Sequence, residues 1–115
     1  MVLTTIEINR QDSFGDILST RDDNGDLIDA SGWTIYFTVR REVVDTSIYT
    51  DSDAVISVEI AGQSSGLHTL SLTPTQTNIE PGNYFYDVQV KKSDTDIESS
   101  GKKLFIVNGD ITRTI

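Results

Sequence analysis

The sequence predicts an all-β fold, an antiparallel β-sandwich of about seven to eight strands. Apolar and polar residues alternate with a period of two along most of the chain, and helical periodicity is nearly absent. Turn signals such as Asn24-Gly25 and Pro81-Gly82 separate these short alternating segments. Many short strands joined in this way are typical of a sandwich or a barrel. The 115 residues fit one domain, 1–115, in which 109–115 is expected to be a C-terminal arm or an edge strand.

The clearest predicted strand covers residues 33–40. One of its faces carries the apolar residues Trp33, Ile35, Phe37 and Val39, and the other carries Thr34, Tyr36, Thr38 and Arg40. A register shift of one residue would bury Arg40 and expose Trp33, so the pairing of this strand should be firmly set.

The remaining predicted strands follow the same alternation. Their ranges are 4–9, 13–20, 54–60, a segment around 70–72, a segment around 84–90, and 103–107. In the strand around 84–90, the inward residues are predicted to be Tyr84, Tyr86, Val88 and Val90. In the last strand, the apolar face is assigned to Leu104 and Ile106. The break in alternation at Gly15-Asp16 indicates a β-bulge or a change of sheet.

Two connecting segments are long enough to matter for the fold. Residues 41–53 are weakly patterned, and form either a loop or a short irregular edge strand. Residues 93–101 are rich in Ser, Asp and Thr, and they are expected to close the last hairpin.

The composition excludes several classes of protein. Cysteine is absent, which rules out disulfides and thiolate metal sites. The net charge of −9, with only nine Lys and Arg, argues against a nucleic-acid surface. The nearest thing to a basic cluster is expected to keep strand ends soluble, and consists of Lys91, Lys92, Lys102 and Lys103. Residues 1–7 do not resemble a signal peptide, and no apolar run approaches the roughly 20 residues of a membrane span. We therefore expect no nucleic-acid or membrane partner.

An acidic loop is the first candidate for a cation site, because calcium prefers several oxygen ligands on a tight loop. Its carboxylates are Asp22, Asp23, Asp26 and Asp29. The calcium-loop pattern begins correctly at Asp22, but it fails at Leu27 and Trp33, where Gly and Glu are required. A solvated hairpin tip is the favoured interpretation, and a weak cation site is the alternative.

Catalysis has little support in the sequence. His68 is the single histidine, no nucleophile-elbow motif surrounds any serine, and no pair of carboxylates stands out for glycoside chemistry. Zinc sites without cysteine usually need more than one histidine. We expect His68 to be structural or to lie at an interface, near the margin of the inward face, and we expect no catalytic residue, metal or cofactor.

Outward-facing aromatic residues and the C-terminal segment are the candidate interface. Tyr36 and Phe85 fall on the outward phase of their strands, and they would form a joint patch if strands 33–40 and 83–91 are neighbours. The other candidate residues are Tyr49, Ile111 and Ile115. The last two belong to 109–115, which could pair with a neighbouring subunit by strand addition.

Four segments together show a resemblance to a known family. They are residues 10–14, 22–40, 66–90 and 101–107, which contain a glycine-bearing acidic turn before an alternating strand and the run Gly82-Asn83-Tyr84-Phe85-Tyr86-Asp87-Val88. In this order the segments resemble the N-terminal domain family of phage baseplate upper proteins and related tailed-phage virion proteins. The resemblance covers about residues 4–110.

The resemblance implies an immunoglobulin-like β-sandwich that serves as a non-enzymatic structural protein of a tailed-phage virion. The expected partners are other virion proteins and further copies of the chain in a symmetric particle, assembled in the host cytoplasm. The expected positions are the baseplate, the tail or neck, and the head decoration. Family baseplate proteins continue into further segments where this chain stops, which counts against a baseplate-scaffold role and leaves head-decoration, neck and tail-accessory positions. One alternative is a carbohydrate- or cell-surface-binding module that uses Tyr36, Tyr49 and Phe85. Another is a small hydrolase, which predicts a cleft that gathers His68 with at least two carboxylates.

Overall fold

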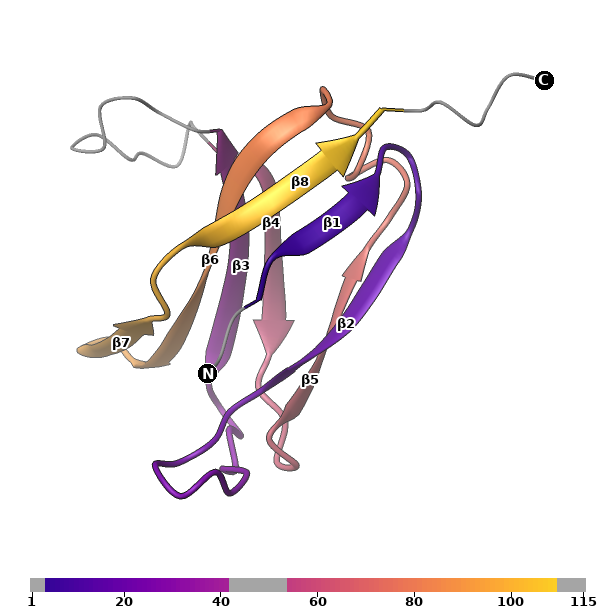
Figure 1. The fold of residues 1–115 in the computed structure, drawn as a ribbon. Coiled ribbons are helices and arrows are strands. Elements are labelled where there is room, and N and C mark those ends of the chain that lie inside the picture. Colours follow the sequence, from indigo (N-terminus) through magenta and orange to yellow (C-terminus); the bar gives the residue numbers. More distant parts are fainter. Residues whose placement is uncertain (1–3, 42–53, 110–115) are drawn as a thin grey trace.

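The computed structural model describes residues 4–41 and 54–109, which form eight strands and contain no helix (Figure 1). The strands are β1 Ile6–Asn9, β2 Phe14–Ser19, β3 Thr34–Arg41, β4 Ala54–Ala61, β5 Leu67–Leu72, β6 Gly82–Ser93, β7 Asp96–Ser99 and β8 Lys103–Asn108. The prediction of an all-β fold is confirmed. None of these residues belongs to a helix long and apolar enough to span a membrane.

The strands form one curled sheet and one small sheet (Figure 1). The curled sheet has the order β1-β8-β6-β3-β4, with β7 also paired to β6, and the small sheet consists of β2 and β5. Every strand pair is antiparallel except β1 with β8, which run parallel. The predicted antiparallel arrangement is therefore wrong for β1. No tight hairpin joins β1 to β8, because they lie at opposite ends of the sequence, and so the chain connection does not impose an antiparallel pairing.

Strand β3 occupies the interior of the curled sheet, between β4 and β6. Its residues Ile35, Phe37 and Val39 are fully buried, as the alternation predicts, and Trp33 packs against the core just before the strand begins. Burial of each such side chain contributes roughly 1.5–3 kcal/mol. A one-residue slip of β3 would remove three of them from the core at once, which explains its firm register.

Aromatic residues from three neighbouring strands meet at the centre of the core. The ring centroid of Phe37 lies 5.2 Å from that of Tyr86 and 6.4 Å from that of Phe105, and Tyr86 and Phe105 are 6.3 Å apart. The Tyr86 hydroxyl donates a hydrogen bond to the backbone carbonyl of Thr4, and the Tyr84 hydroxyl donates to that of Glu80 at 2.5 Å. Burial raises the pKa of Tyr86. The predicted inward residues of β6 are confirmed: Tyr84, Tyr86, Val88 and Val90 are all buried.

The predicted face of β8 is wrong. Phe105 and Val107 are buried, whereas Leu104 and Ile106 lie on the opposite, partly exposed phase. Both phases of this strand are apolar, so the alternation does not distinguish them. Tertiary packing selects Phe105, because it pairs directly with Tyr84 and its ring stacks edge-on against Phe37 and Tyr86.

The predicted bulge or sheet change in β2 is also absent from the structure. The register of β2 with β5 runs without a shift from Phe14 opposite Leu72 to Ser19 opposite Leu67. Asp16 shares the phase of buried Leu18 but is itself exposed, so it interrupts the apolar pattern without changing the backbone. A strand at the edge of a sheet tolerates such a charge because one side of it stays in contact with water.

The segment 93–101 contains more structure than a simple hairpin closure. It includes β7, which pairs with the second half of β6, while β8 pairs with the first half. The long β6 therefore carries two successive partners along one edge. Of the other predicted connection, 41–53, all but the first residue lies outside the described residues.

Residues 62–66 bring two parts of the chain into close backbone contact. The Ala30 amide donates to the Gln63 carbonyl at 3.1 Å, the Gly62 amide donates to the Trp33 carbonyl at 2.9 Å, and Ala30 is fully buried. A Cβ atom added at Gly62 would lie 2.1 Å from the Ala30 carbonyl oxygen. Glycine is therefore required at this position by backbone proximity.

We predict that Gly62→Ala destabilises the protein by about 3 kcal/mol or more, because the clash is with backbone that has little freedom to move. The matched control is Gly15→Ala, where the nearest atom to the added Cβ is 3.9 Å away. This control should change the free energy of unfolding by less than about 1 kcal/mol. Urea denaturation of both variants measures the difference, and equal effects would contradict the packing described for Gly62.

Candidate docking face

The curled sheet has one face turned away from the core, here called the outer face. Side chains on the outer face alternate with buried ones along β3 and β6, and include Tyr36, Thr38, Arg40, Phe85, Asp87 and Gln89. The strand register places Arg40 opposite Phe85, Thr38 opposite Asp87, and Tyr36 opposite Gln89. Strands β3 and β6 are therefore neighbours, as the prediction of a joint aromatic patch requires.

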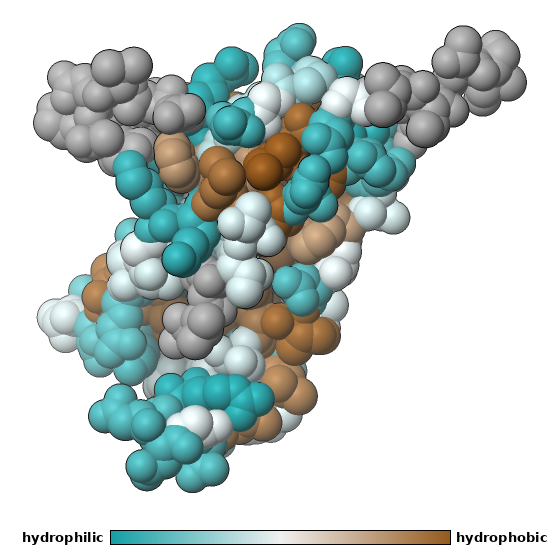
Figure 2. All heavy atoms as spheres, viewed as in Figure 1, coloured by the Kyte–Doolittle hydropathy of each residue, from teal (hydrophilic) through white to brown (hydrophobic). Residues whose placement is uncertain are grey.

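Phe85 belongs to a small apolar cluster on the outer face. It lies directly opposite Leu104, and Ile106 is the next outward residue along β8; all three are partly buried. We call Phe85, Leu104 and Ile106 the outer apolar patch. Figure 2 shows brown, hydrophobic spheres over the region of β6 and β8, bordered by teal, hydrophilic ones. Partly buried apolar residues surrounded by polar ones are typical of a protein-binding surface.

Tyr36 does not join this patch. In the register it lies opposite Gln89, four residues along β6 from Phe85, a separation of about 13 Å. The ion pair of Arg40 and Asp87 lies between the two aromatic residues. The structure thus brings Tyr36 and Phe85 to one face but keeps them apart. The other candidate residues, Tyr49, Ile111 and Ile115, lie outside the described residues.

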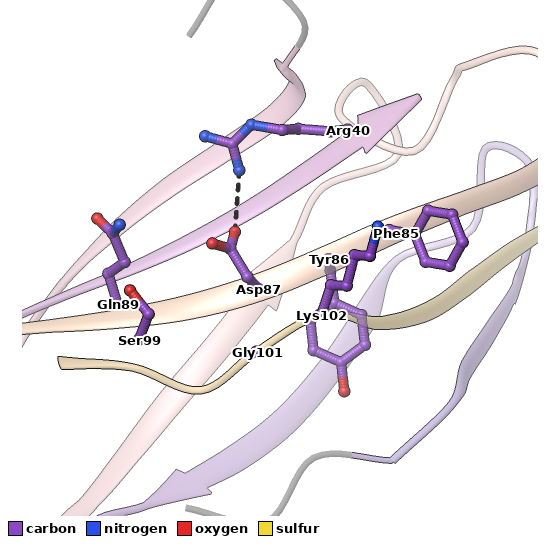
Figure 3. Close-up of a pocket in the computed structure, with 8 residues that line it drawn as sticks. All are labelled: Arg40, Phe85, Tyr86, Asp87, Gln89, Ser99, Gly101 and Lys102. Carbon is purple, nitrogen blue, oxygen red and sulfur yellow. Dashed lines mark hydrogen bonds and ion pairs between the residues drawn. The ribbon is translucent and has the colours of Figure 1, made fainter. Parts of the chain in front are cut away.

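Charged side chains border the outer apolar patch. The Lys102 ammonium nitrogen lies 4.8 Å from the centroid of the Phe85 ring, a cation–π contact. Arg40 Nη1 donates to Asp87 Oδ1 at 2.9 Å, with the two side chains 19% and 26% exposed (Figure 3). Such partial exposure allows water to screen the pair, so it contributes little to stability. The pair places the guanidinium beside the patch.

A depression of about 440 Å³ lies next to Phe85 on the outer face. Asp87, Gln89 and Ser99 line it together with Phe85, Arg40 and Lys102, and Figure 3 shows Tyr86 projecting to the other side of β6. The depression therefore combines one aromatic side chain with charged and hydrogen-bonding groups. This combination can receive a side chain of a partner protein, and its dimensions also suit a small polar molecule.

Two of the four carboxylates of the acidic loop accept hydrogen bonds within its own turns. Asp22 Oδ1 accepts hydrogen bonds from the amides of Asn24 at 2.9 Å and Asp26 at 3.0 Å. Asp29 Oδ1 accepts from the hydroxyl and the amide of Ser31, and these bonds lower the pKa of Asp29. In residues 4–41 and 54–109, no group of three or more His, Cys, Asp or Glu is arranged to hold a metal ion.

His68 is fully buried, deeper than the predicted margin of the inward face. The Gln63 amide donates to Nδ1 at 3.2 Å, so the proton of the neutral ring is on Nε2, which donates to Thr20 Oγ1 at 3.2 Å. The Thr20 hydroxyl in turn donates to the Ile28 carbonyl at 3.1 Å. Both ring nitrogens therefore join separate segments of the chain, and burial lowers the pKa of His68.

Sequence reasoning identified Phe85 but missed its neighbours in the patch. Leu104 and Ile106 were assigned to the core, because an apolar residue on either phase of β8 fits the alternation equally well. The signal that could have revealed the patch is the unbroken apolar run 104–107, since a strand that is apolar on both faces must either be covered on both or expose one.

The comparisons with known proteins do not indicate a function. Neither a protein-family model nor a curated protein matches the chain. The function is therefore inferred from the residues of the outer face and from the sequence patterns.

We predict that protonation of His68 destabilises the fold below about pH 6.5. Because its folded-state pKa is lowered, the unfolded chain binds the proton more readily. The contribution of neutral His68 to stability is complete above the unfolded pKa of about 6.5, and it is lost as the pH falls from there toward the folded pKa. Because a single proton is involved, the free energy of unfolding changes by at most about 1.4 kcal/mol per pH unit through this group.

The measurement compares wild type with His68→Leu by urea denaturation at pH 7.5 and pH 5.5. His68 is the only histidine, so the variant lacks the side chain that titrates in this range. The stability advantage of wild type should be smaller at pH 5.5 than at pH 7.5. An advantage that stays constant between the two would contradict a buried, neutral His68.

Proposed function

We propose that the chain is a non-enzymatic structural protein of a tailed-phage virion that acts through protein–protein contacts on its outer face. The observation that supports this most is the outer apolar patch, which is partly buried and bordered by Lys102 and the Arg40–Asp87 ion pair. The resemblance of residues 22–40 and 66–90 to the N-terminal domain family of phage baseplate upper proteins supports the class of particle. Its place would be in the virion, after assembly in the host cytoplasm.

We also infer that the two sheets are arranged as an immunoglobulin-like sandwich. In that fold, strands C, F and G are neighbours in one sheet and strands B and E are neighbours in the other. Here β3, β6 and β8 are neighbours in the curled sheet, as strands C, F and G are. Strands β2 and β5 are neighbours in the small sheet, as strands B and E are. The hydrogen bond from the Tyr84 hydroxyl to the Glu80 carbonyl supports the same inference, because a tyrosine at the start of strand F makes this contact in many such sandwiches.

The outer apolar patch suits docking better than catalysis. Buried aromatic and aliphatic side chains contribute most of the binding energy of an interface, while surrounding polar groups exclude water and set the orientation. In the outer apolar patch the aromatic and aliphatic side chains are Phe85, Leu104 and Ile106. The surrounding polar groups are Lys102 and Asp87. A partner that presents an apolar side chain beside a carboxylate would complement both the patch and Lys102.

The direct test is the protein content of purified particles. Phage particles from a lysate of the host that carries the gene would be purified by density-gradient centrifugation and analysed by quantitative mass spectrometry. We expect the chain at a fixed number of copies per particle. Its absence from purified, infectious particles would refute the virion proposal.

We predict that Phe85→Ser lowers incorporation into particles at least about tenfold, because it removes the central side chain of the patch. The matched control is Ile17→Ser, which removes an apolar side chain that is 55% exposed on β2, away from the outer face. The control should be incorporated as wild type is. Complementation of a deletion phage with each variant, after circular dichroism confirms folding, gives the comparison. Equal incorporation of both variants would exclude the outer apolar patch as the docking surface.

The depression beside Phe85 favours a second candidate function, a carbohydrate- or cell-surface-binding module. Its aromatic ring and the polar groups of Asp87, Gln89 and Ser99 are the kinds of group that bind a sugar. Lys102 already covers the Phe85 ring, and Tyr36 is too distant to act as a second stacking platform, so this candidate ranks below the first. Glycan-array binding that is lost on Asp87→Asn and Phe85→Ser would reverse the ranking.

A further inference from the structure

Strand β4 presents an unpaired edge. It pairs with β3 along one side, and no other strand in residues 4–41 and 54–109 pairs with its second side. A groove of about 530 Å³ runs along this second side, with Val58, Glu59 and Ile60 on one wall and Leu67 and Thr69 of β5 on the other. The groove therefore separates this side of β4 from β5.

The edge of β4 has few of the devices that usually prevent association. It spans eight residues without Pro or Lys, and its one charged residue is Glu59. Its register with β3 is regular from Ala61 to Ile56 and shifts only at the start of β4, between the pairs Val39–Ile56 and Arg40–Ala54. By comparison, β1 has only four residues, and β2 carries Gly15 and Asp16. Long, regular and weakly charged edges are the ones that pair with further strands.

The register with β3 determines which residues of β4 offer backbone groups to a new partner. The Gly62 amide donates to the Trp33 carbonyl, so this opposed pair is a hydrogen-bonded one. Hydrogen-bonded and non-hydrogen-bonded pairs alternate along an antiparallel ladder, so Ile60, Val58 and Ile56 bond to β3 as well. The amides and carbonyls of Ser57, Glu59 and Ala61 consequently point toward the unpaired edge.

We propose that β4 pairs antiparallel with β4 of a second copy of this chain, with Val58 opposite the partner subunit's Val58. In such a pair of identical strands, hydrogen bonds form only between residues whose backbone groups point toward the shared edge. Ser57, Glu59 and Ala61 must therefore lie opposite residues of this same set, which excludes every second register. The proposed register places Glu59 opposite the partner subunit's Ser57, where a hydroxyl can donate to the carboxylate. It also aligns Ile56 with the partner subunit's Ile60, extending the apolar inner face of the sheet.

The neighbouring registers are less favourable. A shift one way places Glu59 directly opposite the partner subunit's Glu59, and like charges in that position repel. A shift the other way places Glu59 opposite the partner subunit's Val55, which offers no hydrogen-bond donor from its side chain. The hydrogen bond between Ser57 and Glu59, and the absence of a Glu59–Glu59 repulsion, therefore favour the register centred on Val58. This inference does not depend on the virion proposal, because it concerns only the purified chain.

Substitutions at Ser57 test the pairing through charge. Ser57 is exposed, so Ser57→Glu and Ser57→Lys should both leave the fold intact. In the proposed dimer, Ser57→Glu places the new carboxylate opposite the partner subunit's Glu59. The two-fold axis repeats this like-charge pair, so the dissociation constant should rise about 3- to 30-fold. Ser57→Lys creates two opposite-charge pairs, and should lower it about 2- to 10-fold. The matched control, Thr95→Glu in the exposed turn between β6 and β7, should leave it unchanged.

Sedimentation velocity of each variant, from about 5 to 500 μM protein at about 0.15 M salt, measures the association. We expect a reversible dimer for wild type and the stated order of variants. A wild-type protein that stays monomeric over this range would overturn the proposal. Ser57→Glu and Ser57→Lys variants that associate equally well would also overturn it.

Disulfide trapping tests the register. The chain has no cysteine, so Val58→Cys introduces one thiol per subunit. In the proposed register the two Val58 Cα atoms form a non-hydrogen-bonded pair about 4.5 Å apart, within reach of a disulfide. Ala61→Cys is the control, because the two Ala61 positions would be about 20 Å apart. Faster oxidation of Val58→Cys to a covalent dimer supports the register, and faster oxidation of Ala61→Cys refutes it.

Discussion

The pairing of β6 with β3 is the constraint on which the rest of the described structure depends. β6 is the longest strand, and it pairs with β3 along one edge and with β7 and β8 along the other. Its alternation carries Tyr86 into contact with Phe37 and Phe105, which closes the aromatic centre of the core. Because side chains on a strand alternate strictly between its faces, the same register that buries Tyr86 must turn Phe85 and Asp87 outward.

The outer face is thus a direct consequence of the core. Phe85 meets Leu104 across the sheet only because Tyr84 meets Phe105 one residue away. A change of register that separated the outer apolar patch would also disrupt the core, so one register fixes both. A surface whose backbone is already ordered suits docking, since little backbone entropy is lost when a partner binds.

The unpaired edge of β4 and the outer apolar patch offer two different kinds of contact. The edge presents backbone groups to a strand of suitable register, whereas the patch presents side chains to a complementary surface. They lie on separate parts of the curled sheet, because β3 and β6 stand between β4 and β8. If both proposed contacts form, the chain can bind a second copy and a different neighbour at once, because the two surfaces do not overlap.

The amino-acid sequence by itself determined the all-β class, the strand at 33–40 and its buried face, and the inward residues of β6, because local alternation is unambiguous where one phase is apolar and the other polar. It also identified Phe85 as outward-facing. Only the tertiary structure decided the phase of β8, where both faces are apolar, the parallel pairing of β1, and the unbroken register of β2 past Asp16. The requirement for glycine at position 62 and the buried setting of His68 likewise arise from segments distant in sequence, Ala30 and Thr20, which no local pattern brings together.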